Sequence, residues 1–203
     1  MIEVIAAIAR WSQLVANLIL LGSCVFLAIT STGKRVVIPV WVERLERLFP
    51  WLSIGILLGL LVVLITTIVQ VTGNINNLWQ QETWLGILKD TRVGHIWIWR
   101  AALAVLLLSV VIYLRKTPKA RWRYILCAVT AALPIIASSL ASHIAAEELT
   151  VMAIMPYALH LILGGIWFGA LPAFLLLIYD EHNKQKNDLE FKTLKRFSAI
   201  ALP

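Results

Sequence analysis

Residues 155–179 read MPYALHLILGGIWFGALPAFLLLIY, a run of about 25 residues whose only acidic or basic side chain is His160. Because about 20 apolar residues in a helix cross the hydrocarbon core of a bilayer, this run predicts a membrane span. Gly165 and Gly169 have the four-residue spacing that lets a second helix approach closely. The span is therefore expected to pack tightly against another helix.

His160, Gly164 and Trp167 share one face of this predicted helix. By helix rise, His160 lies roughly 10 Å inside the hydrocarbon. An ionisable side chain at that depth is costly in lipid. We therefore expect His160 to point at other protein.

The bulk composition extends the membrane assignment to the whole chain. The sequence is 60% hydrophobic and only 14% charged, with a mean hydropathy of +0.84. A soluble chain of 203 residues could not cover its surface with so few charges. The net charge of +7 comes from bases in short loops beside spans, where they orient the protein. The expected partner is therefore the lipid bilayer, and no nucleic acid is expected.

Four further apolar runs predict spans, at about residues 4–30, 51–72, 96–114 and 122–145. The amphipathic segment VWVERLERLF, residues 40–49, is expected to lie along the membrane interface with Trp41 and Trp51 as anchors. Residues 73–95 are polar enough to form an interfacial cap. The fold class is thus an all-α, polytopic transmembrane helical bundle.

The chain is expected to form a single membrane domain, residues 1–203, with a charged cytoplasmic linker at residues 184–196. Phe197 opens another apolar segment, so we expect five complete spans and the start of a sixth, in a fragment of a longer protein. Four bases lie between the first two spans, five between the third and fourth and five after the fifth, against two and none in the alternate loops. The N-terminus is therefore predicted to be periplasmic.

With this topology, one level in the outer half of the membrane gathers ionisable groups from four different spans. These groups are Arg10, Arg100, His143 and His160, with His95 at the edge and Met152 and Met155 at the same level. Such groups mark a pathway, a relay or a ligand site. Because imidazole with thioether suits copper, the predicted metal ligands are the histidines and methionines of this set.

Two alternatives stay open for these residues. Each histidine could hydrogen-bond a neighbouring helix while the arginines reach the headgroups. Alternatively, His143 and His160 on adjacent antiparallel helices could be axial ligands of a b-type haem in an electron carrier. A hydrolase is disfavoured because no serine, histidine and acid occur at one depth, so we expect no enzyme. Cys24 and Cys127 lie in apolar segments without CxxC spacing, which indicates neither a disulfide framework nor a zinc site.

Four pieces of the chain resemble the membrane half of the copper-resistance protein D family. They are TRVGHIWIWRAALAVLL (91–107), SHIAAEE (142–148), ALHLILGGIWFGALPAF (158–174) and LKRFSAIAL (194–202). The third piece matches best, with a histidine followed by small residues, a W-x-G and a leucine-rich run. His160, His143, Arg100 and Trp167 stand at matching motif positions.

The resemblance implies a bacterial inner-membrane protein of about eight spans that handles copper with a periplasmic copper-binding partner. The later spans of the family are absent from this sequence. A second membrane chain or a homo-oligomer is therefore a further expected partner.

Overall fold

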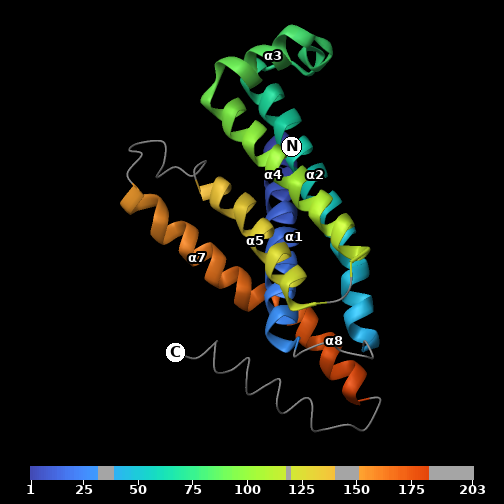
Figure 1. Ribbon diagram of the computed structural model, residues 1–203. Helices are drawn as coiled ribbons and strands as arrows, with labels where there is room; N and C mark the ends of the chain where they lie inside the picture. Colours follow the sequence, from blue (N-terminus) through green and yellow to red (C-terminus); the bar gives the residue numbers. More distant parts are fainter. Residues whose placement is uncertain (32–38, 118–119, 140–150, 183–203) are drawn as a thin grey trace.

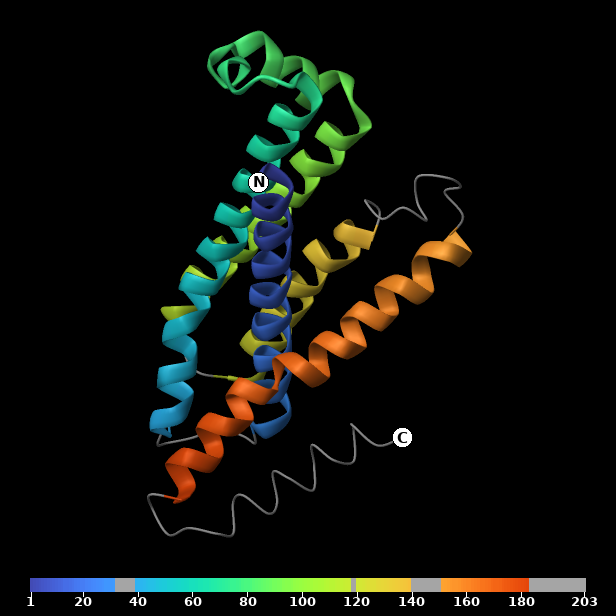
Figure 2. The same cartoon turned by 180° about the vertical axis from the view of Figure 1, so that it is seen from behind.

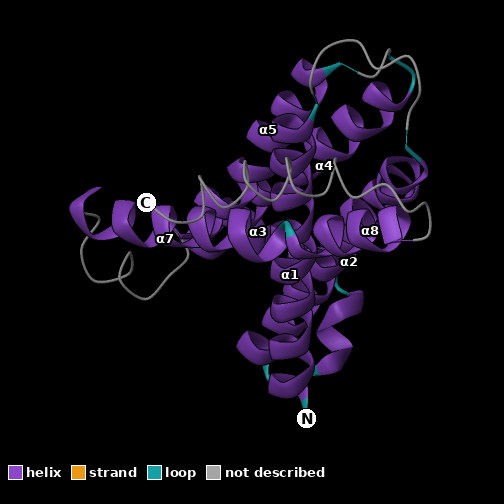
Figure 3. Ribbon diagram, turned by 90° about the horizontal axis from the view of Figure 1, so that it is seen from below, coloured by secondary structure: helices purple, strands orange, loops and turns teal. Residues whose placement is uncertain are grey.

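The computed structural model describes residues 1–31, 39–117, 120–139 and 151–182, and these ranges are helical with short turns between them (Figure 3). The elements in chain order are α1 (Ile2–Thr30), α2 (Val40–Thr72), the 3-10 helix η1 (Ile75–Trp79), α3 (Gln81–Asp90), α4 (Arg92–Arg115), α5 (Arg121–Ser139), α7 (Val151–Gly169) and α8 (Leu171–His182). Five segments are long and apolar enough to cross a membrane, the fifth running through α7 and α8. The predicted all-α bundle with five complete spans is confirmed. The partial sixth span and the linker lie outside the described residues.

Helix α1 is the centre of the bundle (Figure 1). It packs against α2, α5 and α7, while α4 packs on α2 and α5 at one side. The N-terminus and α3 lie at one end of the bundle, which we call the α3 end (Figure 1). At the opposite end, α1 finishes and α2 and α5 begin, so the two ends carry different loops.

The glycine spacing of α7 produces the predicted close helix contact. A Cβ atom at Gly169 would overlap the backbone carbonyl of Leu18, and a Cβ atom at Gly165 would lie 2.7 Å from the Leu18 side chain. Gly22 on α1 meets the backbone of Gly165 and Gly169 in return. Ser23 Oγ donates a hydrogen bond to the Gly169 carbonyl at 3.2 Å. Small residues on both helices therefore let the α1 and α7 backbones touch.

Residues 40–49 differ from the interfacial helix that their amphipathic pattern predicts. They form the first turns of α2, which continues through Pro50 without a break. Trp41 is 1% exposed and makes an edge-to-face contact with Phe26, with ring centroids 6.1 Å apart. Burial of this apolar face against α1 outweighs its affinity for an interface, so Trp41 is a core residue. Trp51, further along the same helix, is 72% exposed.

The short helix predicted within residues 73–95 is present as η1 and α3, and α3 fixes where α4 begins. The Thr91 side chain accepts a hydrogen bond from Gly94 N at 3.0 Å, which is an N-cap. A Cβ atom at Gly94 would overlap the backbone of Ile87, so α3 and α4 pack directly on each other. Helix α4 therefore begins at Arg92 and not near residue 96, which places Arg100 more than two turns inside it.

The last predicted span is not one straight helix. It consists of α7 and α8, which are separated by a turn at Ala170. Pro172 has no backbone N–H, so the regular hydrogen-bond ladder cannot run through this point. The first turns of α7 diverge from the other helices, and α7 crosses α1 near the α7–α8 junction (Figure 2).

Candidate functional site

A pocket of about 580 Å³ opens between the helices towards the α3 end of the bundle. Side chains of α1, α2 and α4 form most of its wall, and α5 and α7 contribute Ser138, Tyr157 and Leu161. The lining is polar for a membrane bundle. Its polar members are Arg10, Gln13, Asn17, Thr67, Gln70, Arg92, Arg100, Ser138 and Tyr157.

Gln13 and Arg100 join the two sides of this pocket. Arg100 Nη2 donates a hydrogen bond to Gln13 Oε1 at 3.2 Å, and Gln13 is only 4% exposed. Arg100 therefore faces the pocket and protein, as its depth predicts. Trp97, one turn earlier on α4, donates from Nε1 to the Leu60 carbonyl at 2.8 Å. Helix α4 is thus tied by side-chain hydrogen bonds to both α1 and α2.

Two buried polar atoms of the pocket find no partner among the described residues. They are Arg100 Nε and Asn17 Oδ1, and Asn17 is 3% exposed. A buried donor or acceptor without a partner is costly, and the pocket is large enough to hold water that would satisfy both atoms.

The pocket also concentrates positive charge. Arg10 from α1 lies at it with Arg92 and Arg100 from α4, as expected for Arg10 and Arg100. The described lining residues include three arginines and no aspartate or glutamate. The wall has hydrogen-bond donors in excess, so it suits water or an anion and does not supply soft metal ligands.

The predicted metal ligands lie elsewhere, and the structure describes only some of them. His95 is exposed in the first turn of α4, and Met155 is exposed on α7. His143 lies outside the described residues, and Met152 belongs to α7 in a part whose side chains are not described. In the ranges that are described, no three His, Cys, Asp or Glu side chains gather into a metal-binding group.

His160 differs from the expectation that it points at other protein of this bundle. Gly165 and Gly169 form the face of α7 that meets α1, whereas His160, Gly164 and Trp167 lie on an exposed face. A Cβ atom at Gly164 would meet no described atom within 4 Å. The tight contact forms through Gly165 and Gly169, and the 100° helical step then turns His160 away from it.

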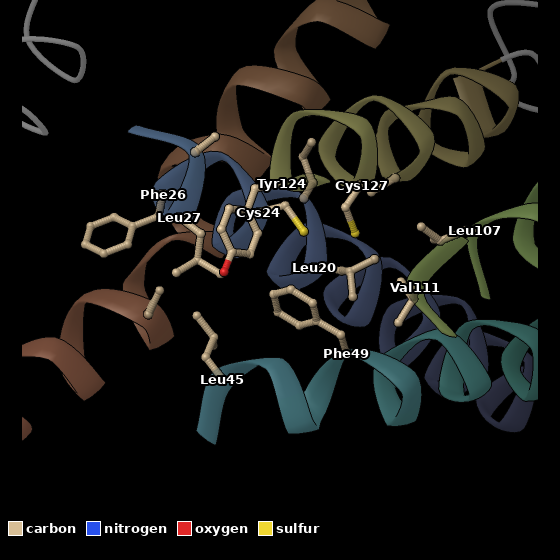
Figure 4. Close-up of a cluster of buried hydrophobic side chains, with 14 of the residues drawn as sticks. Leu20, Cys24, Phe26, Leu27, Leu45, Phe49, Leu107, Val111, Tyr124 and Cys127 are labelled. Carbon is tan, nitrogen blue, oxygen red and sulfur yellow. The ribbon is translucent and has the colours of Figure 1, made fainter. Parts of the chain in front are cut away.

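A second polar cluster, which the sequence did not suggest, lies at the opposite end of the bundle. Tyr124 Oη donates a hydrogen bond to Glu46 Oε1 at 2.6 Å, and Arg123 Nη2 lies 3.6 Å from the same oxygen. Cys24 and Cys127 lie next to this group in the main core (Figure 4). The amphipathic pattern of residues 40–49 predicts Glu46 on a surface helix, so only the fold reveals the cluster.

The helical fold and its buried polar groups define a polytopic membrane protein with an internal polar site. The family model for the copper resistance protein D-like N-terminal domain matches residues 1–154 of the sequence. The chain therefore belongs to this family. The predicted family is confirmed, although the matched region ends before His160. The chain is also 32% identical over 152 residues to the copper transport protein CutJ of Bacillus subtilis (strain 168), covering 70% of this chain and 27% of CutJ. No solved structure matches the chain.

Proposed function

We propose that this chain is part of a non-enzymatic protein of the bacterial inner membrane that handles copper in transport, resistance or homeostasis. Membership of the copper resistance protein D-like family over residues 1–154 carries this proposal. The relative CutJ is described as a copper transport protein, and this chain spans about a quarter of its length. Copper is the cargo in this proposal and not a resident cofactor.

The proposed orientation puts the α3 end of the bundle in the periplasm. In the sequence, the connections from α1 to α2 and from α4 to α5 are rich in lysine and arginine, and Lys116 and Arg121 lie at the opposite end of the bundle. Loops rich in lysine and arginine stay in the cytoplasm. The polar pocket then lies in the outer half of the membrane, and a periplasmic copper-binding protein is the proposed partner at the α3 end.

His160 and His143 are the proposed principal copper ligands, with His95, Met152 and Met155 as secondary candidates at the same level. The exposed face of α7 supports a role for His160, because its side chain is exposed in the part of the chain that the structure describes. Gly164 beside it leaves room for another helix to approach. That helix would come from a longer form of the protein, a second membrane chain or a second copy. No observation favours the haem alternative.

Metal analysis of the purified protein tests this proposal. The His160→Ala variant should lose the copper bound at the histidine site under reducing conditions and remain in the membrane, while a His182→Ala control in the charged segment should bind copper as the wild type does. Equal copper stoichiometry in the His160→Ala and wild-type proteins would reduce His160 to a surface residue of α7 and overturn its assignment as a ligand.

A further inference from the structure

Two cysteines from distant parts of the sequence meet in the core at the end of the bundle opposite to α3. Cys24 on α1 is 0% exposed, and Cys127 on α5 is 3% exposed. Both belong to the same cluster of buried side chains, and Figure 4 shows their sulfur atoms pointing into one region of the core between α1 and α5. The packing of α5 on α1 brings the two thiols together.

The surroundings of this thiol pair are not purely apolar. Next to Cys127 is a small void of about 10 Å³, which Glu46, Arg123 and Tyr124 also line. This volume is about that of one water-sized probe. The guanidinium of Arg123 stacks over the Tyr124 ring, 5.4 Å from its centroid.

We propose that Cys24 and Cys127 form a two-thiolate site for Cu(I). The inference rests on the proposed function, because copper handling is what makes Cu(I) the relevant soft cation. Thiolates select Cu(I) over harder cations, and two thiolates are enough to hold it in a linear arrangement. A structural zinc site needs four ligands, and no three candidate ligands gather in the described ranges.

The atoms and charges of Cu(I) binding at this site balance without any oxidation or reduction. Two S–H bonds are lost, two Cu–S bonds form and two protons pass to water, while copper stays in the +1 state. The resulting complex carries one negative charge. The Arg123 guanidinium, which also pairs with Glu46 at 3.6 Å, lies beside Cys127 and can offset part of this charge.

The site is separate from the pocket at the α3 end but shares a helix face with it. Gln13, Asn17 and Cys24 are spaced by 4 and 7 residues, so they line one side of α1 and all are buried. The rise of a helix places Cys24 roughly 16 Å from Gln13 along the axis. The thiol pair is thus a second copper position, towards the other side of the membrane from the proposed histidine ligands.

Titration of the purified 203-residue chain with Cu(I), without oxygen and against a chromophoric Cu(I) chelator, tests the inference. The wild type should show a near-ultraviolet thiolate-to-copper band, and Cys24→Ser and Cys127→Ser should each lose that band and one Cu(I) equivalent. Thr130→Ala is the matched control, because Thr130 is buried one turn from Cys127 and its hydroxyl bonds carbonyls of its own helix. It should keep both the band and the equivalent.

The His160→Ala variant separates this inference from the proposed function. If it loses copper while the cysteine variants bind as the wild type does, the thiol site is wrong and the histidine proposal stands. If only the cysteine variants lose Cu(I), the thiol site stands and the histidine assignment fails.

X-ray absorption at the copper edge identifies the copper ligands in the wild type, so this test does not depend on whether the cysteine variants fold. Two sulfur neighbours together with the thiolate band support the site. Nitrogen and oxygen neighbours alone, or a Cys24–Cys127 disulfide that persists under reducing conditions, overturn it.

Discussion

The Arg100 guanidinium on α4 donates a hydrogen bond to the Gln13 amide oxygen on α1 at 3.2 Å, across the polar pocket. This contact connects two helices that are far apart in the sequence. It holds a positive charge towards protein and away from lipid, where the cost of an arginine is about 2.5–3.5 kcal/mol on insertion scales.

Replacing Gln13 by leucine should destabilise the bundle by about 1–3 kcal/mol, because the Arg100 guanidinium loses its acceptor in a buried position. Thermal unfolding in detergent measures the change. The control is Arg10→Met, whose side chain is exposed and should cost little. A larger loss in Arg10→Met than in Gln13→Leu would contradict the proposed role of the Arg100–Gln13 pair.

The contact between α1 and α7 predicts opposite outcomes for two glycines of α7. Gly169→Ala should destabilise the protein by about 1–3 kcal/mol, because its Cβ atom would overlap the Leu18 carbonyl. Gly164→Ala should be neutral or slightly stabilising, since the described structure is open there. Melting temperatures of both variants, measured side by side, check this pair. Equal losses would mean that α7 meets α1 through a different face.

The buried Glu46 carboxylate is expected to stabilise the end of the bundle opposite to α3. Glu46→Ala removes both the acceptor of Tyr124 Oη and the partner of Arg123, so it should cost about 3–5 kcal/mol. Arg47→Ala, one residue further and exposed, should stay within about 0.5 kcal/mol of the wild type. Unfolding by denaturant in detergent gives both values, and a mild Glu46→Ala phenotype would show that Arg123 needs no charged partner.

The proposed orientation is tested by cysteine labelling in intact cells. In a background carrying Cys24→Ala and Cys127→Ala, a cysteine from Glu147→Cys should react with an impermeant maleimide from the periplasm. A cysteine from Pro118→Cys should react only after the cytoplasmic side is opened. Labelling in the reverse pattern would invert the topology and place the polar pocket in the inner half of the membrane.

Local features of the sequence determined the class of fold and one helix contact. The apolar runs are long enough to specify spans regardless of their neighbours, since backbone groups in lipid must be satisfied within each helix. Gly165 and Gly169 predicted close packing because a glycine has no side chain to keep a second helix away at that position. The predicted depth of Arg100 likewise marked it as part of a pathway, relay or ligand site, and Arg100 lines the polar pocket.

Tertiary packing decided which helix faces are buried and which distant residues meet, and the periodicity of the sequence does not determine either. The amphipathic pattern of residues 40–49 fits a membrane surface or a bundle interior, and contact with Phe26 selected the interior for Trp41. His160 lies on an exposed face because α1 packs against the neighbouring face of α7, which carries Gly165 and Gly169. Cys24 meets Cys127, and Glu46 meets Tyr124, only because α1, α2 and α5 begin or end at the same end of the bundle. Such pairs depend on distances in space between residues far apart in the chain, and no local pattern encodes those distances.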